Sequence, residues 1–303
     1  MNFELTAPAK SARISLSSSA VIVSVDVNVW TATKQDRTIS NEVTTLKNAS
    51  ADAGKFTKNL LANCPEHKAL LNYRQTIYNW LQRSTYAWAG GMQVLPTINL
   101  EKFKAEYAAH EREFAKLLTE FETIYPNLVS DAAFKQGDMF SRSDYPDVQE
   151  IRGKFRMKMF VTKVPENDFR SGVIADAIAE DLKHHYEQQV TEIVDNIMAD
   201  AADRFLEIAS RLRNACEEAQ PDDDGKVRRK KIYETTVVQA KEIAKTLKAF
   251  NLTDNRALAE ACDAMDSALS SVSLDDLRES SYVRQTVKSD LDDILNKFRP
   301  IGL

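Results

Sequence analysis

Residues 173–299 contain almost no helix breakers, and this constrains the fold more than any other feature of the sequence. The stretch has one proline and one glycine, both in the cluster Pro-Asp-Asp-Asp-Gly at Pro221–Gly225. Such a cluster is typical of a turn, whereas a long run without proline or glycine favours helix. We therefore predict two helical arms, residues 168–219 and 226–299, that form an antiparallel hairpin.

Apolar residues recur every three or four positions along both arms, as expected of helices with one buried face. In the second arm we expect a kink or break at Asn251–Asn255, and Ser273–Asp276 has the pattern of a capping box. The expected fold class is mainly α, an elongated helical bundle or coiled-coil hairpin. The apolar stripe of the first arm comprises Ile174, Ile178, Leu182, Tyr186, Ile193, Ile197, Phe205, Ile208 and Leu212.

Two segments alternate apolar and polar residues with the period of two that is typical of strands. One is Val21–Trp30, whose odd-numbered valines we expect to be buried, and the other is Phe155–Val164. A strand needs a hydrogen-bonding partner. We therefore expect the two to pair in a small β-sheet of N-terminal and mid-chain strands, with Val94–Ile98 nearby. The apolar face of the second strand would comprise Phe155, Met157, Met159 and Val161.

Helical periodicity predicts further helices between these strands. One apolar stripe extends from Val43 through Leu46 to Leu60. Another extends from Phe103 to Ile124, and we expect Pro126 to end that helix because proline lacks a backbone N–H.

Charge and aromatic content divide the chain near its middle. Residues 1–163 carry 21 Lys and Arg against 17 Asp and Glu, whereas residues 164–303 carry 19 against 28. Of the 25 aromatic residues, 18 precede residue 164. We therefore predict a flexible leader at residues 1–18, an aromatic-rich α+β part at 19–164 and a long helical hairpin at 165–303.

The sequence lacks the usual signatures of an enzyme or a metalloprotein. Its three cysteines are far apart and odd in number, which argues against a disulfide framework or a zinc site. With no signal-peptide pattern and no apolar run of membrane length, we expect a cytoplasmic protein. Asp181 and His184 resemble half of a di-iron motif whose second half is missing. We expect no catalytic residues, no metal site and no cofactor.

Two runs of cationic residues are candidate binding sites for nucleic acid or for a protein partner. The first would lie on one face of the mid-chain strand beside Phe160, where it could follow a phosphate backbone. The second, within residues 226–231, begins a helix at the hairpin tip, and a solvated surface is its alternative interpretation. The first run is Arg152, Lys154, Arg156, Lys158 and Lys163, and the second is Arg228, Arg229, Lys230 and Lys231.

An apolar segment at residues 86–98 surrounds two consecutive glycines. It is a candidate tongue that docks a partner or touches a membrane, and the alternative is a buried connection between helices. No phosphate-binding glycine motif is present. The candidate tongue residues are Trp88, Gly90, Gly91, Met92 and Leu95.

Several motifs together resemble an uncharacterised family from tailed phages and integrative elements. They are SVDVNVWTATK, whose strand ends in Asp-x-Asn-x-Trp, the following helical segment, the Gly-Gly-Met…Leu-Pro connection and the Tyr-Pro pair. Members of the family are encoded near a MoxR-type AAA+ ATPase and a von Willebrand A protein. The resemblance spans most of the chain. It implies a phage or mobile-element origin, a host cytoplasmic location and one of these two proteins as a partner, but no reaction.

Three classes of function follow from these observations. The first is a non-enzymatic helical adaptor or assembly factor that acts with a partner AAA+ ATPase system. The second is a nucleic-acid-binding accessory protein that uses the two basic runs. The third is a membrane-active helical protein with the 86–98 tongue, and membrane contact is the least expected of the three. The sequence leaves homo-oligomerisation open.

Overall fold

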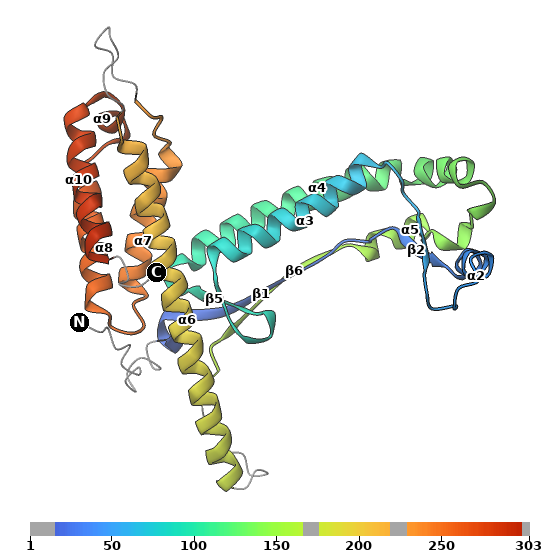
Figure 1. Cartoon of the computed structure of the whole chain (residues 1–303), viewed down its shortest axis with the longest axis horizontal. Coiled ribbons are helices and arrows are strands. Elements are labelled where there is room, and N and C mark those ends of the chain that lie inside the picture. The colour runs from blue at the N-terminus through green and yellow to red at the C-terminus, as the bar shows by residue number, and fades with distance from the viewer. Residues whose placement is uncertain (1–15, 166–175, 219–228, 299–303) are drawn as a thin grey trace. The chain divides into compact units, whose positions relative to one another are not determined.

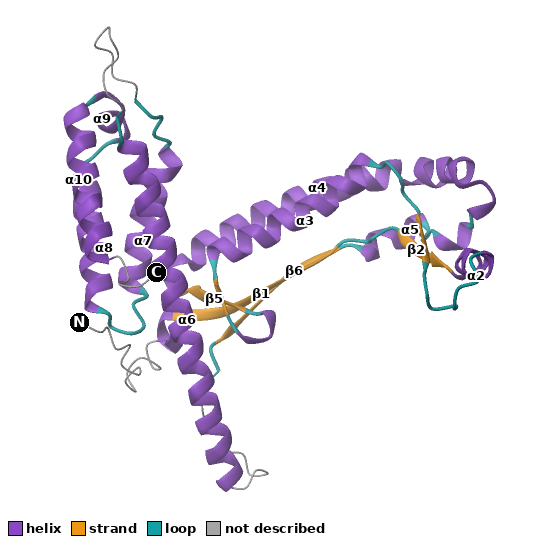
Figure 2. Ribbon diagram, in the orientation of Figure 1, coloured by secondary structure: helices purple, strands orange, loops and turns teal. Residues whose placement is uncertain are grey.

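The structure of the protein is a computed structural model that describes residues 16–165, 176–218 and 229–298. It is mainly α-helical with a small antiparallel sheet, as the sequence predicts (Figure 2). The chain divides into two compact units. Unit 1 comprises Met1–Val23, Thr85–Glu101 and Val161–Leu303, and unit 2 comprises Ser24–Ser84 and Lys102–Phe160. Residues 85–101 therefore group with the C-terminal helices, although the sequence analysis assigned them to the N-terminal part.

The larger sheet has the strand order β4-β5-β1-β6 (Figure 1). Strands β1 and β5 pair antiparallel, with Ala20 opposite Pro96 and Val23 opposite Gln93. The predicted neighbours are therefore correct, because β6 lies beside β1 and the segment near Val94 supplies β5. The strand bounds are Ala20–Asn28 for β1, Tyr86–Ala87 for β4, Gln93–Pro96 for β5 and Arg156–Lys163 for β6.

Burial along β1 changes phase within unit 1, at Ile22 and Val23, which are both buried. In unit 2, Val25 and Val27 are buried, as predicted for the odd-numbered valines. In unit 1, Ala20 and Ile22 belong to the buried helical core, whereas Val21 is only partly buried. The first residues of β1 thus pack their even-numbered face on the unit 1 helices, which a simple alternation of valines does not reveal.

The apolar face predicted for β6 is shorter than expected. Phe155 is buried and Met157 and Met159 are partly buried, but Val161 is 47% exposed. The prediction for Val161 is therefore wrong, because the packing against this face ends one pleat before that residue.

Unit 1 is built mainly from α6, α7, α8 and α10, which pack around one core. Helix α6 packs on α7 and α10, and α8 packs on the same two helices. Arg213 of α6 donates to Asp292 of α10. Arg284, which precedes Asp292 in α10, donates to the carbonyl of Ala215, which follows Arg213 in α6, so α10 runs antiparallel to α6. The bounds are Asp176–Cys216 for α6, Glu234–Ala249 for α7, Arg256–Ser270 for α8, Leu274–Glu279 for α9 and Ser281–Phe298 for α10.

This arrangement differs from the two-armed hairpin that the sequence predicts. In such a hairpin, residues near 180 would lie beside residues near 290. Instead, Asp292 contacts Arg213, and residue 180 lies about 50 Å farther along α6 at 1.5 Å per residue. The predicted tip at Pro221–Lys226 lies outside the described residues.

The difference arises at Asn251–Asn255, where the chain reverses rather than kinks. The Asn251 side chain bonds both the N–H and the carbonyl of Asn255. Asp254 has a positive φ of 50°, a left-handed conformation that asparagine and aspartate tolerate best among non-glycine residues. Asn255 then caps α8 by accepting from the Leu258 N–H. The capping box predicted at Ser273–Asp276 is present at the start of α9.

Unit 2 combines α3 and most of α4 with the second half of β1, the start of β6 and a two-stranded sheet. The small sheet pairs β2 with β3 antiparallel, with Asp36 opposite Phe56. Buried aromatic residues, among them Phe121, Tyr125 and Phe155, fill the space between these elements. The bounds are Thr33–Asp36 for β2, Arg37–Leu46 for α2, Phe56–Asn59 for β3, Pro65–Ser84 for α3, Leu100–Gln136 for α4 and Val148–Ile151 for α5.

Two predictions in this region are wrong. Helix α4 continues through Pro126 to Gln136. The neighbouring Tyr125 is fully buried and donates a hydrogen bond to the Pro146 carbonyl, so tertiary packing outweighs the single backbone bond that proline removes. The predicted helical stripe from Val43 to Leu60 ends instead at Leu46, before a polar turn in which Asn48 has a positive φ, and the chain continues as β3.

Candidate interaction surfaces

The first basic run is divided between two local structures. Arg152 and Lys154 lie in a 3₁₀ turn rather than in β6, so the four cations predicted on one strand face are not brought together. Two of the run's arginines are ion-paired, Arg152 with Glu122 at 2.9 Å and Arg156 with Asp26 at 2.6 Å. Lys163 is exposed at the end of β6.

The two lysines of this run that lie in unit 2 remain available. Lys154 and Lys158 are exposed, and their side chains make no ion pair within the described residues. Lys158 shares the exposed face of β6 with Arg156 and with Phe160, which is 61% exposed. This is a small patch of two lysines, one paired arginine and an accessible aromatic ring.

The second basic run is engaged in contacts within unit 1. Arg229 pairs with Glu218 at 3.0 Å and donates to the carbonyl of Glu279. Lys230 pairs with Glu217 at 2.9 Å, and the Lys231 ammonium lies 5.0 Å from the centre of the Tyr233 ring. These contacts hold residues 229–231 against the end of α6 and against α9. Arg228 lies outside the described residues.

The candidate tongue is a β-hairpin formed by β4 and β5. The Trp88 N–H donates to the Met92 carbonyl, and Gly90 and Gly91 close the turn with φ of 66° and 78°, values that favour glycine. Leu95 is fully buried, and Trp88 and Met92 pack against the unit 1 core. The glycines are exposed, so the tip presents mainly backbone rather than apolar side chains.

Metal binding and membrane crossing find no support in the described ranges. There, no group of three or more His, Cys, Asp or Glu side chains is placed to hold a metal ion. His184 and His185 each contact the glutamine one turn later, Gln188 and Gln189. Within the same ranges, no helix has both the length and the apolar character to span a bilayer.

The first four turns of α6 carry an apolar stripe that the bundle does not cover. From Ile193 onwards the predicted stripe packs in the unit 1 core, where Ile197, Phe205 and Leu212 are buried and Ile193 and Ile208 are partly buried. Before Ile193, Ile178 is 57% exposed and Leu182 is 38% exposed, one turn apart on the same face. The Tyr186 hydroxyl donates to the Pro165 carbonyl at 2.5 Å and marks the end of this exposed stretch.

Helix α2 in unit 2 has its apolar face turned outwards. Its buried residues are Ser40 and Thr44, whereas Val43 is 49% exposed and Leu46 is 78% exposed. Ser40 donates to the Asp36 carbonyl and accepts from the Phe56 N–H, and Thr44 donates to the Ser40 carbonyl. The hydroxyls therefore satisfy hydrogen bonds on the buried side, and the apolar residues face solvent.

A buried ion cluster fixes the start of α2. The Lys58 Nζ atom lies 3.2 Å from Asp36 and 2.6 Å from Asp144, and it donates to the Met139 carbonyl. Hydrogen bonding to Asp144 raises the pKa of Lys58. Asp36 caps α2 by accepting from the Ile39 N–H, and this bond lowers the pKa of its carboxyl. The helix thus starts at a buried lysine that two carboxylates share.

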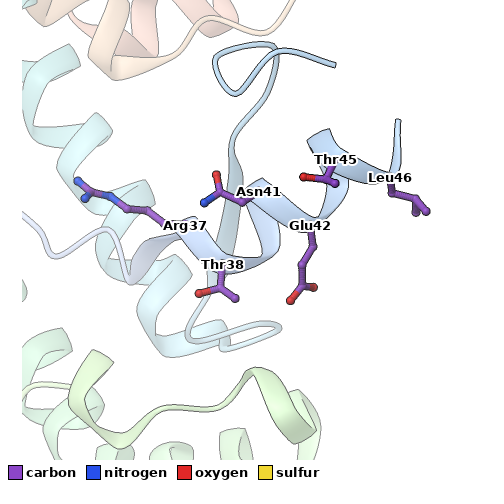
Figure 3. Close-up of a pocket in the computed structure, with 6 residues that line it drawn as sticks. All are labelled: Arg37, Thr38, Asn41, Glu42, Thr45 and Leu46. Carbon is purple, nitrogen blue, oxygen red and sulfur yellow. The ribbon is translucent and has the colours of Figure 1, made fainter. Parts of the chain in front are cut away.

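The exposed side of α2 also borders a shallow depression (Figure 3). All of its lining residues come from this one helix, and Leu46 is the only apolar one. A surface formed by a single exposed helix suits contact with another helix better than enclosure of a small molecule. The lining residues are Arg37, Thr38, Asn41, Glu42, Thr45 and Leu46.

Sequence analysis did not identify α2 as a surface. The signal was the spacing of Ile39, Val43 and Leu46 together with hydroxyl residues at positions 40 and 44. Serine and threonine on the buried side of a helix can be recognised only when their partners are known, here the Phe56 N–H of β3, which donates to the Ser40 hydroxyl.

The chain matches no protein-family model, no curated protein and no solved structure.

Proposed function

We propose that this protein is a non-enzymatic adaptor or assembly factor that works in the cytoplasm with a partner AAA+ ATPase system. The observation that carries the proposal is the uncovered stripe on α6, where Ile178 and Leu182 are exposed next to a well-packed core. Exposed apolar residues in register with a buried stripe are typical of a protein-docking surface. The later part of α6, which packs in the unit 1 core, would anchor this stripe.

The charges around the stripe indicate the chemistry of the partner. Residues 178–189 carry the acids Glu180, Asp181 and Glu187 against the single cation Lys183. A complementary partner surface would have an apolar centre with Lys or Arg at its rim. The partners to test first are the MoxR-type ATPase and the von Willebrand A protein implied by the resemblance.

The test is a binding measurement with each of these two purified proteins. The double variant Ile178→Asp, Leu182→Asp should reduce binding at least about tenfold, because it places charge in the apolar centre of the contact. The matched control, His184→Asp with Gln188→Asp, adds the same charges at exposed positions of the same helix, about 120° around its axis from the stripe, and should bind like wild type. Equal binding by both variants, or no binding by wild type to either protein, would reject the proposal.

A second candidate function is nucleic-acid binding by the patch around Lys158. It is favoured by the unpaired Lys154 and Lys158 beside exposed Phe160, because cations and an aromatic ring suit single strands. Two free cations predict a salt slope of about 1.4 in log K for single strands. Fluorescence anisotropy with labelled oligonucleotides over a salt series tests this. Lys154→Glu with Lys158→Glu should abolish the slope, and exposed Lys55→Glu should not.

A further inference from the structure

We propose that two copies of this chain associate through α2, with the two helices side by side and parallel. The proposal concerns a surface of unit 2 and does not depend on the α6 stripe. Its basis is the outward apolar face of α2, whose residues Ile39, Val43 and Leu46 follow the 4-3 spacing of a coiled-coil seam. Ile39 is partly buried and the other two are exposed.

The residues that flank the seam are oppositely charged at the spacing a parallel pair needs. If Val43 occupies heptad position a and Leu46 position d, Glu42 occupies the flanking position g and Lys47 the flanking position e, five residues later. Parallel helices bring these two flanking positions together across the interface. Both side chains are exposed and make no ion pair within the described residues. A symmetric dimer would therefore form two Glu42–Lys47 pairs.

The side of α2 that packs on the rest of unit 2 also favours the parallel orientation of the two helices. Ser40 and Thr44 are buried, so the body of unit 2 lies on the same flank of the seam as Lys47. An antiparallel pair brings like flanks together, which would force the two bodies onto one side and place Glu42 next to its symmetry mate. A parallel pair places the bodies on opposite sides, so that neither conflict arises.

The contact is small, because α2 has ten residues and presents three seam side chains. Interfaces well below about 1,200 Å² are weak and transient. We therefore expect a dimer that forms reversibly with rising protein concentration rather than an obligate one. The buried base formed by Lys58, Asp36 and Asp144 keeps α2 in place in the monomer.

Sedimentation velocity of the full chain, up to about 1 mM to cover weak specific association, tests whether a dimer forms. Wild type should shift from monomer to dimer. Val43→Asp should weaken association at least about tenfold. Thr45→Asp, an exposed position of the same helix off the seam, is the matched control and should associate like wild type. A monomeric wild type over the whole range overturns the proposal, as does equal association of the two variants.

Charge exchange tests the orientation. Glu42→Lys alone and Lys47→Glu alone should each weaken the dimer about tenfold, because like charges then meet at both flanks. The double variant should return to within about threefold of wild type. If the single changes have no effect, or if the double variant is no better than the singles, the parallel pairing is wrong. Binding of an ATPase partner through α6 is measured separately, so either idea can fail alone.

Discussion

Replacing Arg284 should destabilise unit 1 more than any other single arginine change in the described chain. Arg284 is 2% exposed and has no carboxylate partner among its contacts. It donates to the carbonyls of Leu277 at 2.6 Å, Lys230 at 3.0 Å and Ala215 at 3.3 Å. Two of these carbonyls lie in the last turns of α9 and α6, where helices have no intrahelical donor left. One guanidinium therefore satisfies two acceptors at helix ends and, in addition, the Lys230 carbonyl.

The magnitude follows from those three acceptors. Arg284→Met removes the buried charge as well as the donors, so the desolvation cost of the charge is recovered. What remains is the burial of three unpaired carbonyls, each worth about 1 kcal/mol or more, less some apolar contact by the methionine. We expect a loss of about 2–4 kcal/mol in the free energy of unfolding. This corresponds to a fall of roughly 10 °C in the melting temperature.

Cys216 provides a local assay. It lies next to Ala215, is 1% exposed, and has a pKa that burial raises to about 11, so its thiol reacts only when this end of the bundle opens. Mass spectrometry after pulsed maleimide labelling should show faster modification of Cys216 in Arg284→Met. Cys64 in unit 2 should be unaffected. Arg256→Met is the control, because that side chain is 91% exposed. Stability within about 0.5 kcal/mol of wild type, with unchanged Cys216 labelling, would refute the reasoning.

Three further changes test other parts of the structure. Val25→Asp should cost several kcal/mol in urea unfolding because Val25 is 5% exposed, whereas Val161→Asp, at an exposed position, should cost little; equal losses would show that the β1 face is not buried. Lys58→Met should cost about 3–5 kcal/mol because it leaves two carboxylates uncompensated, whereas exposed Lys55→Met should be neutral, and a stable Lys58→Met would rule out the ion cluster. Arg213 lowers the pKa of Asp292 below its ordinary value of 3.8, so this contact stabilises the fold above pH 3.8 and is lost as the pH falls through the lower, folded-state pKa. The stability difference between wild type and Asp292→Asn should therefore disappear in acid titrations, and a difference that persists at the lowest pH would contradict this assignment.

The strands were predictable because their pattern is local. Alternation over residues 23–29 and 155–159 requires only that one face be buried, and burial there follows it. The pattern failed at Val21 and Val161, where a change of neighbouring unit or the end of packing decides which residues are covered. Those limits depend on residues distant in sequence.

The helices were predictable as elements but not as an arrangement. The break at Asn251–Asn255 was visible from residue type, yet a kink and a reversal have the same local signature. After a kink, α8 would continue the direction of α7, whereas after a reversal it packs beside α7. In the structure α8 packs against α7 and α10, so the chain reverses. Likewise, Pro126 predicts the end of a helix, but α4 continues to Gln136 because the buried Tyr125 anchors it at this point.

The candidate surfaces were predicted in part. Lys154 and Lys158 are exposed as expected, but the partners of Arg152 and Arg156, namely Glu122 and Asp26, come from other elements. No spacing rule identifies them. The run at Arg229–Lys231 illustrates the same point. Its two ion pairs are with Glu217 and Glu218, and its third cation lies over a tyrosine ring.

The division of the chain into two units has a consequence for synthesis on the ribosome. Unit 2 is complete in sequence once Phe160 has emerged, whereas unit 1 needs residues from both ends of the chain. Buried residues of unit 1 such as Leu16, Ile22 and Val94 are made early but gain their helical partners only after residue 190. At about 5–20 residues per second, these apolar segments wait on the order of 10 s. During that interval the nascent chain carries a folded unit 2 flanked by uncovered strands, and these are the segments that a chaperone would be expected to shield.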